Sequence, residues 1–140
     1  SNLNIPLFPG GGHSGYVYAS NELILPKLEQ FNPDIVIVAC GYDASGVDPL
    51  SRMLCGSDTF AYMTQKLMSF TKGKLVLAHE GGYSDVHVPF CGHSVLQALS
   101  GSVVSVEDPL AERIKSQQPD PTFDQLQFKR IRSIANLHGL

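Results

Sequence analysis

The residue best placed for chemistry is Asp43, which follows closely on a short apolar run at residues 35–40. The run is too short for a helix and does not alternate with polar residues, so it predicts a strand buried on both faces. Ligands of open α/β sheets bind just beyond the carboxyl ends of the strands, which makes Asp43 a candidate ligand or base. A loop carboxylate that caps the next turn would fit this stretch equally well.

Two further strands are expected. The apolar run at residues 74–79 predicts a second buried strand, and it too ends in glycine, with Gly81 and Gly82 before Tyr83. Alternating apolar residues at 3–7 predict another short strand, which its proline would restrict to a sheet edge or a strand end. Both buried runs therefore lead directly into glycine-containing loops that carry polar side chains.

Helices are expected between and after these strands. Helical periodicity and capping residues predict them at residues 14–31, 57–70, 89–99, 109–116 and 122–137. Pro26 should kink or divide the first of them, because proline lacks an amide hydrogen. The Asp-Pro pairs at 108–109 and 120–121 are typical helix openings and should begin the last two.

This order of elements predicts the fold class, a layered α/β arrangement. Three parallel strands would be joined by long crossovers, which are right-handed in such sheets. The loops that follow the strands would then emerge at one edge of the sheet. We therefore expect the glycine loop at 10–12, Asp43 and Tyr83 to converge in one cleft, although they lie far apart in sequence.

Composition narrows the class of protein. The 140 residues are 43% hydrophobic and 16% charged, an ordinary balance for one soluble domain, and a net charge of −3 argues against a nucleic-acid surface. No apolar run approaches the roughly 18 to 20 residues of a membrane span, and no signal peptide is recognisable. Cys40, Cys55 and Cys91 lack CxxC spacing and fit reduced thiols, so we expect a cytoplasmic protein. From its charge and its apolar runs we expect no direct nucleic-acid or membrane partner.

Several motifs follow one another along roughly residues 2–100. In chain order they are Asn4-Ile5-Pro6-Leu7 with its Pro-Gly loop, Pro33-Asp34, Gly41-Tyr42-Asp43-Ala44, Asp48-Pro49-Leu50 and Glu80-Gly81-Gly82-Tyr83. Together they resemble the carboxyl-terminal signatures of the histone deacetylase superfamily, and most closely the bacterial class II deacetylase-like amidohydrolases. The resemblance implies a three-layer αβα fold of the arginase/deacetylase type and a Zn2+-dependent enzyme that removes acetyl groups from N-acetyl-lysine or acetylpolyamines.

The resemblance also implies roles for single residues. Asp43 matches a zinc ligand of the family, and Tyr83 matches the tyrosine whose hydroxyl donates to the substrate carbonyl. Leu50 matches an apolar residue of the acyl-lysine channel, and Gly81 and Gly82 match glycines that let the channel wall approach the substrate. These roles suit amide hydrolysis, in which zinc polarises the carbonyl and acidifies water while a hydroxyl donor stabilises the oxyanion.

Other residues resemble metal ligands or nucleophiles without matching the family's pattern. Asp48 is expected to support a turn or cap rather than bind metal. The Asp85-Val86-His87 segment has the Asp-x-His spelling of the family's other zinc ligands but follows the tyrosine motif instead of preceding Asp43, so we expect it to be a decoy. The remaining candidates are expected to be structural or polar surface residues: His13, His79, His93, His138 and Cys91.

The family's Asp-x-His ligands and its proton-handling His-His pair have no match in the sequence. We therefore expect residues 1–140 to be the carboxyl-terminal portion of one deacetylase-like catalytic domain, with a helical tail at 107–140. Such a portion should be inactive alone and should self-associate through its incompletely covered sheet. The alternative is a catalytically silent α/β module for assembly or binding that descends from such an enzyme.

Overall fold

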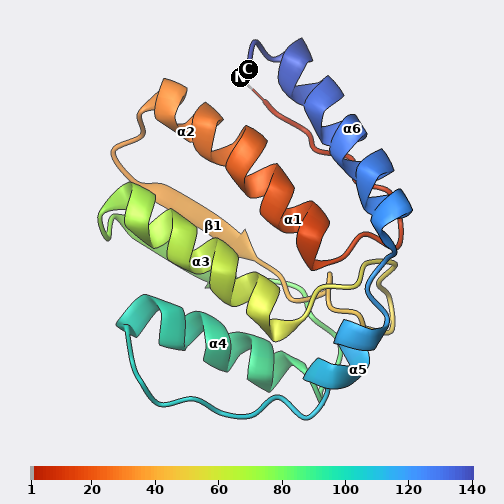
Figure 1. The fold of residues 1–140 in the computed structure, drawn as a ribbon. Helices are drawn as coiled ribbons and strands as arrows, with labels where there is room; N and C mark the ends of the chain where they lie inside the picture. Colours follow the sequence, from red (N-terminus) through yellow and green to blue (C-terminus); the bar gives the residue numbers. More distant parts are fainter. Residues whose placement is uncertain (1) are drawn as a thin grey trace.

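The computed structural model describes residues 2–140. Its elements, in chain order, are α1 (His13–Ala19), the π-helical segment η1 (Ser20–Ile24), α2 (Leu25–Phe31), β1 (Val36–Cys40), α3 (Ser57–Thr71), β2 (Leu75–His79), α4 (Val88–Ser100), α5 (Ala111–Ser116) and α6 (Pro121–Leu137). Figure 1 shows α3 lying across β1, with α4 on one side of it, the α1–α2 run on the other and α6 along the outside of α1. The mixture of helices and parallel strands confirms the predicted α/β class.

The two strands pair in parallel, with Val36 opposite Leu75 and Cys40 opposite His79. Their inward side chains pack against α3 and α4 in a hydrophobic core that includes Cys40, Phe60, Cys91 and Val95. This core holds the carboxyl ends of both strands at one edge of the sheet, where the loops that follow them begin.

The opposite face of the sheet is open. Ile37 is 70% exposed and its cross-strand partner Val76 is 47% exposed, while Val38, the next residue along β1, is partly buried. The prediction of burial on both faces is therefore wrong for the described residues. Both faces are apolar, as in parallel sheets covered on both sides, but within residues 2–140 helices cover only one of them.

The predicted strand at residues 3–7 does not form, and the described sheet has two strands rather than three. Leu3, Ile5 and Leu7 do alternate in burial, but they pack against the core between α1 and α6. The amide of Phe8 donates to the side chain of Gln127 at 3.0 Å, so this end of the segment bonds a helix side chain instead of a strand. The alternation of apolar residues at 3–7 correctly indicated that one side of the segment is buried, but it did not indicate whether the segment pairs with a strand.

The prediction that Pro26 divides the first helix is confirmed. The helical run from His13 to Phe31 contains the π-helical segment η1, and Pro26 stands at the second position of α2, directly after it. Proline has no amide hydrogen to donate to the preceding turn, and the π-type turn there, which is wider than an α-helical turn, accommodates the missing hydrogen bond.

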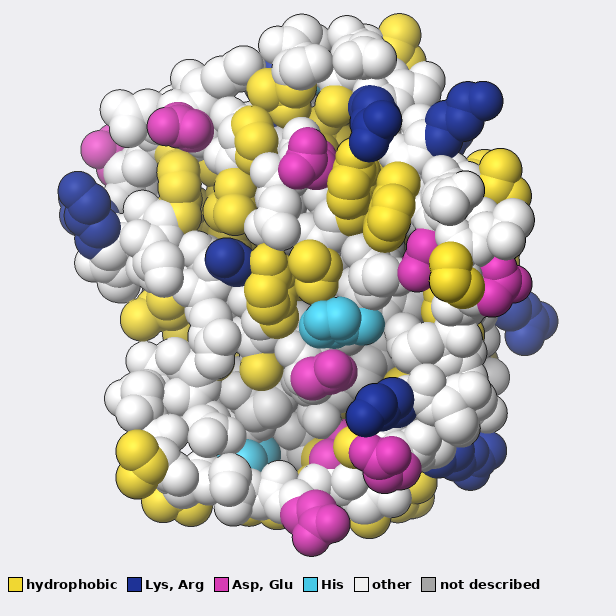
Figure 2. Space-filling model, viewed as in Figure 1, with side chains coloured by type: hydrophobic (Ala, Val, Ile, Leu, Met, Phe, Trp, Pro, Cys, Tyr) yellow, Lys and Arg dark blue, Asp and Glu magenta, His cyan; other side chains and the backbone are white. Residues whose placement is uncertain are grey.

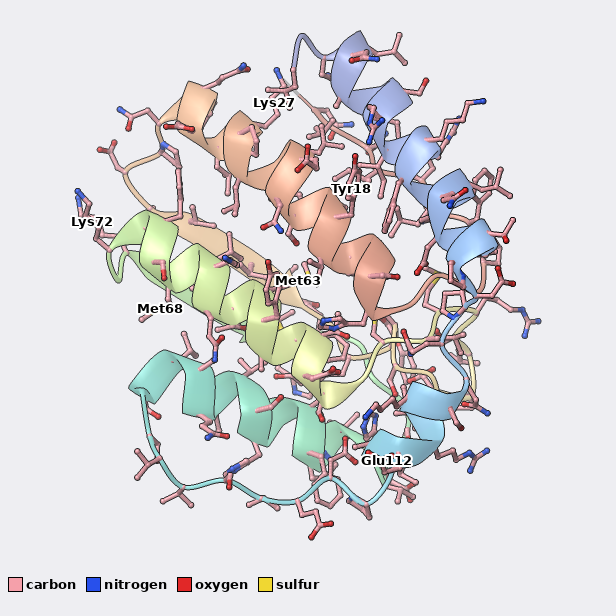
Figure 3. All side chains as sticks on the ribbon, in the orientation of Figure 1. Tyr18, Lys27, Met63, Met68, Lys72 and Glu112 are labelled. Carbon is pink, nitrogen blue, oxygen red and sulfur yellow. The ribbon has the colours of Figure 1, made fainter. Side chains whose placement is uncertain are left out.

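The carboxyl-terminal tail is part of the fold. Asp120 caps α6 by accepting from the amides of Thr122 and Phe123, as predicted, whereas α5 begins two residues later than expected. Figure 3 shows Tyr18 on α1 directed toward α6, where it stacks on Phe128 with ring centroids 4.2 Å apart.

Hydrophobic side chains remain visible among intermixed charges on the face drawn in Figure 2. No helix among residues 2–140 has the length and apolar character that crossing a membrane requires.

Candidate active site

Asp43 lies in the loop that leaves β1. Its neighbour Tyr42 anchors this loop: the Tyr42 amide donates to the Gly81 carbonyl at 2.8 Å, and the Tyr42 ring packs edge-on against Phe60 at 5.2 Å between centroids. Tyr42 is buried and Asp43 is exposed, so the loop turns its carboxylate outward. Residues 2–140 provide no hydrogen bond to that carboxylate, which leaves its oxygens available to a ligand.

Gly81 brings Asp43 and Tyr83 together. A Cβ atom built on Gly81 would overlap Oδ2 of Asp43 and would lie 3.4 Å from the hydroxyl oxygen of Tyr83. The carboxylate and the phenol therefore both lie over the same glycine, beyond the carboxyl ends of adjacent parallel strands. The predicted convergence of Asp43 and Tyr83 is confirmed as a matter of placement.

Gly82 is required for a different reason. Its φ of +128° lies in a region that residues other than glycine rarely adopt. A Cβ there would also lie 3.0 Å from both Tyr42 and Val88. Within this chain, the two glycines thus make room for Asp43 and for the packing of Tyr42. Their predicted contact with substrate stays a prediction.

Asp48 supports the site instead of pointing into it. Its Oδ2 accepts from the Tyr83 amide at 2.7 Å, and its Oδ1 accepts from the Leu50 amide at 2.9 Å. The side chain is buried, and both oxygens are occupied by backbone donors. The turn role expected for Asp48 agrees with this geometry, but the sequence did not indicate the bond to Tyr83. Leu50 itself is 70% exposed.

The glycine loop at 10–12 lies against residues 52–54 and Gln118. The Gly10 amide donates to the carbonyl of Arg52 at 2.6 Å, and Gly12 packs so closely on Gln118 that a Cβ would overlap its side chain. The premise of the prediction was a strand at residues 3–7. That strand is absent from the described sheet, and the convergence of this loop with Asp43 and Tyr83 stays a prediction.

The described residues do not complete a metal site. A catalytic zinc normally has three protein ligands and an open position. Within residues 2–140, no group of three His, Cys, Asp or Glu side chains is arranged to hold a metal ion. Asp43 has an exposed carboxylate to which residues 2–140 provide no hydrogen bond, so they could contribute it as one ligand to a zinc site but could not form the site.

The Asp-x-His spelling at 85–87 is not a ligand pair. His87 is fully buried, and its two ring nitrogens are already engaged, Nδ1 with Ser45 at 2.6 Å and Nε2 with Asp108 at 2.9 Å. Asp85 is exposed on the other side of the turn. Sequence spacing did not indicate this use of Ser45, His87 and Asp108, because the three residues meet only through tertiary structure.

Cys91 is a core residue, as expected. Its side chain is fully buried, and burial raises the pKa of its thiol to about 12. A thiol with so high a pKa is not a nucleophile at neutral pH. His13, expected as a polar loop residue, begins α1 and pairs with Thr59 at 3.0 Å.

These features define an α/β domain with a carboxylate and a tyrosine at the carboxyl edge of a parallel sheet. Residues 1–99 match the family model described as Histone deacetylase domain. Because the match covers more than half of the sequence, the chain belongs to the histone deacetylase domain family.

Individual relatives agree with this assignment. The chain is 46% identical over 143 residues to a histone deacetylase-like amidohydrolase from Pseudomonas aeruginosa, covering 99% of this chain and 38% of that protein. It is 34% identical to histone deacetylase 8 from Arabidopsis thaliana, covering 79% of this chain and 30% of that protein. The structure of the histone deacetylase Clr3 superposes with a TM-score of 0.75 at 29% identity, over 96% of this chain and 21% of that one. The chain therefore spans less than two fifths of each of these relatives.

Proposed function

We propose that the complete protein is a Zn2+-dependent amidohydrolase that removes acetyl groups from N-acetyl-lysine or acetylpolyamines. Water adds to the amide carbonyl, the C–N bond breaks, and acetate and a free amine leave. The observation that carries the proposal is that the Asp43 carboxylate and the Tyr83 hydroxyl both lie next to the position that a Cβ atom on Gly81 would take. Membership of the deacetylase family supports the reaction class.

In this proposal each residue has a definite task. Zinc, when bound in the complete protein, would polarise the carbonyl and lower the pKa of water. Asp43 offers a hard, exposed carboxylate as one ligand. Tyr83 offers a hydroxyl that donates to the carbonyl oxygen as negative charge develops on it, a term worth roughly 3 kcal/mol in other hydrolases. Leu50, exposed on the loop that Asp48 braces, would contact the alkyl chain of the substrate.

A second candidate is a catalytically silent module for binding or assembly. The observation in its favour is that residues 2–140 contain no group of three side chains arranged to hold a metal ion. The two candidates make opposite predictions for the complete natural protein, which hydrolyses acetyl amides in the first case and does not in the second.

The test compares two polypeptides with the same two substrates. Acetate release from N-acetyl-lysine peptide and from an acetylated polyamine is measured with added zinc, for the complete natural protein and for residues 1–140 alone. We expect turnover by the complete protein, its loss on chelation and no turnover by residues 1–140. Chelator-resistant turnover or a complete protein without turnover would refute the proposal.

The proposal extends to the setting of the enzyme. We propose that it acts in the cytoplasm, in support of which Cys40, Cys55 and Cys91 are free and buried rather than paired. The substrate is a small acetylated amine or a lysine side chain. Residues 1–140 in isolation should also self-associate through the open sheet face.

A further inference from the structure

A buried polar chain runs beneath the candidate site. The hydroxyl of Ser45 lies 2.6 Å from Nδ1 of His87, and Nε2 of His87 lies 2.9 Å from Oδ2 of Asp108. The same carboxylate oxygen accepts from the hydroxyl of Ser57 at 2.6 Å. Ser45 is 2% exposed and His87 is fully buried. Such a network is costly to bury unless every member is satisfied, and here each has a partner.

The three residues have the composition of a hydrolytic Ser-His-Asp triad but cannot act as one. A nucleophilic serine must meet the substrate carbonyl, and Ser45 is buried under its own loop. The value of the arrangement must therefore lie in what its members hold in place.

Ser45 holds the loop that carries Asp43. Its amide donates to the Tyr42 carbonyl at 3.1 Å, and its carbonyl accepts from the Asp48 amide at 3.1 Å. Its hydroxyl oxygen also accepts from the Val47 amide at 3.3 Å. Ser45 is thus the centre of the turn between the exposed carboxylate of Asp43 and the bracing carboxylate of Asp48.

His87 holds the turn that carries Tyr83. The amides of His87 and Val88 donate to the carbonyl of Ser84 at 3.1 and 3.0 Å, which closes this turn ahead of α4. Besides the backbone bond from the Tyr42 amide to the Gly81 carbonyl, side chains join the two site loops at two points, through Asp48 to the Tyr83 amide and through Ser45 to His87. Two joints fix a relative orientation, whereas one would allow rotation.

Asp108 is the outer end of the Ser45–His87–Asp108 hydrogen-bond network, and it lies outside the family match at residues 1–99. It lies just before α5, which Figure 1 places beside the amino-terminal ends of α3 and α4. Its Oδ1 accepts from the Leu110 amide at 2.9 Å. Burial alone would raise the pKa of Asp108, but hydrogen bonds from Ser57, His87 and the Leu110 amide hold it below its usual value.

The ionised carboxylate sets the proton positions on His87. Because a carboxylate only accepts, Nε2 carries the hydrogen shared with Asp108, and in the neutral ring Nδ1 then accepts from the Ser45 hydroxyl. Reversing this tautomer would turn a donor–acceptor pair into a mismatch at Asp108. The direction of the whole chain of bonds is thus fixed by Asp108.

We propose that His87 and Asp108 are positioning residues for amide hydrolysis, acting through Ser45 to set where the Asp43 carboxylate stands relative to the Tyr83 hydroxyl. The inference rests on the proposed function and deepens it. It also gives the segment after residue 100 a task in the active site, since Asp108 supplies the outer end of the network.

The first variants are Asp108→Asn and Ser45→Ala in the complete natural protein. Asparagine keeps the shape of Asp108 but presents an N–H group either to His87 or to the Leu110 amide. Ser45→Ala cuts the network at its other end with a small change in volume. The control is Asp120→Ala, which removes the α6 cap, away from Asp43 and Tyr83, and should cost stability by a comparable route.

We expect kcat to fall about 10-fold or more in both network variants with KM little changed, since mutations of residues that orient metal ligands commonly have this effect. Asp120→Ala should retain wild-type kcat. An equal loss of kcat in Asp120→Ala would attribute the effect to general destabilisation and overturn the inference, as would wild-type kcat in both network variants.

Hydrogen exchange supplies a readout that does not depend on turnover. The amides of residues 42–48 and 83–88 should exchange faster in Asp108→Asn and Ser45→Ala than in wild type, and Asp120→Ala should leave them unchanged. Unchanged exchange in the network variants would overturn the inference. A wild-type protein without turnover would overturn the proposed function instead, and the exchange result would then decide alone whether the network orders the two loops.

Discussion

The carboxylate of Asp48 accepts a hydrogen bond of 2.7 Å from the backbone amide of Tyr83, a residue 35 positions later in the chain. This contact is one of three that tie the loop after β1 to the loop after β2, together with the bond from the Tyr42 amide to the Gly81 carbonyl and the bond between Ser45 and His87. Asp43, on the same loop as Asp48, accepts no hydrogen bond from residues 2–140, and its carboxylate faces outward. One loop therefore carries two carboxylates with opposite environments, one that braces and one that is free to bind.

The buried role of Asp48 predicts a stability defect. In the complete protein, Asp48→Ala should lower the free energy of unfolding by about 1–3 kcal/mol, because the amides of Leu50 and Tyr83 lose their acceptor. Zinc content should stay near wild type. Asp48→Asn, which keeps one acceptor oxygen, should lose less. Denaturant titration and metal analysis test this, and loss of zinc at unchanged stability would show that Asp48 is a ligand.

The hydroxyl of Tyr83 predicts a defect in turnover alone. Tyr83→Phe keeps the ring and removes only the donor, so kcat should fall about 100-fold or more while KM changes little. Steady-state kinetics on an acetyl-lysine peptide measure both constants. Tyr62→Phe is a suitable control, since the Tyr62 hydroxyl bonds Asn21 on the surface between α3 and η1. Near-normal turnover by Tyr83→Phe would remove this residue from the mechanism.

The pKa of Asp108 predicts how stability depends on pH. Burial opposes ionisation, but the hydrogen bonds from Ser57 and His87 prevail and hold the folded-state pKa below its usual value. A depressed folded-state pKa contributes stability above the unfolded value of about 4 and loses it as the pH falls through the folded value. The stability difference between wild type and Asp108→Asn should therefore be largest near neutral pH and shrink in acid. Denaturant titrations across that range test this, and a difference that grows in acid would contradict it.

The open sheet face predicts self-association of residues 1–140 in isolation. Ile37 and Val76 form an exposed apolar surface on a two-stranded sheet whose outer edges are unpaired within residues 2–140. Such a surface favours contact with another chain. Sedimentation should show concentration-dependent oligomers that Ile37→Thr weakens. Leu137→Thr, at an exposed position on α6, should leave them unchanged. A monomer at all concentrations would refute this prediction.

Local signals in the sequence were sufficient for much of the fold. The strand before Asp43, the division at Pro26 and the cap at Asp120 each depend on a few adjacent residues, and the structure has all three. The exposure of Ile37 could not be predicted, because apolar sequence on both faces of a strand does not reveal which face is covered within a given stretch of chain. The alternation of residues 3–7 likewise indicated one buried side and was mistaken for strand pairing.

The site was predictable only in its outward-facing part. Asp43 and Tyr83 follow strand ends, and strand polarity brings them together regardless of sequence separation. The support beneath them was not predictable, because Ser45, His87 and Asp108 meet through tertiary packing. The Asp-x-His spelling at 85–87 was expected to be a decoy, and the two occupied ring nitrogens of His87 agree with this expectation.

The central claim is that Asp43 binds the metal of an acetyl-amide hydrolase, and the zinc content of Asp43→Ala in the complete natural protein tests it most directly. Asp85→Ala serves as the control, since Asp85 is an exposed carboxylate on the nearby turn. After purification without chelator, we predict near-stoichiometric zinc in wild type and Asp85→Ala, and a large loss of zinc and of turnover in Asp43→Ala. Zinc retained at the wild-type level by Asp43→Ala would contradict the assignment.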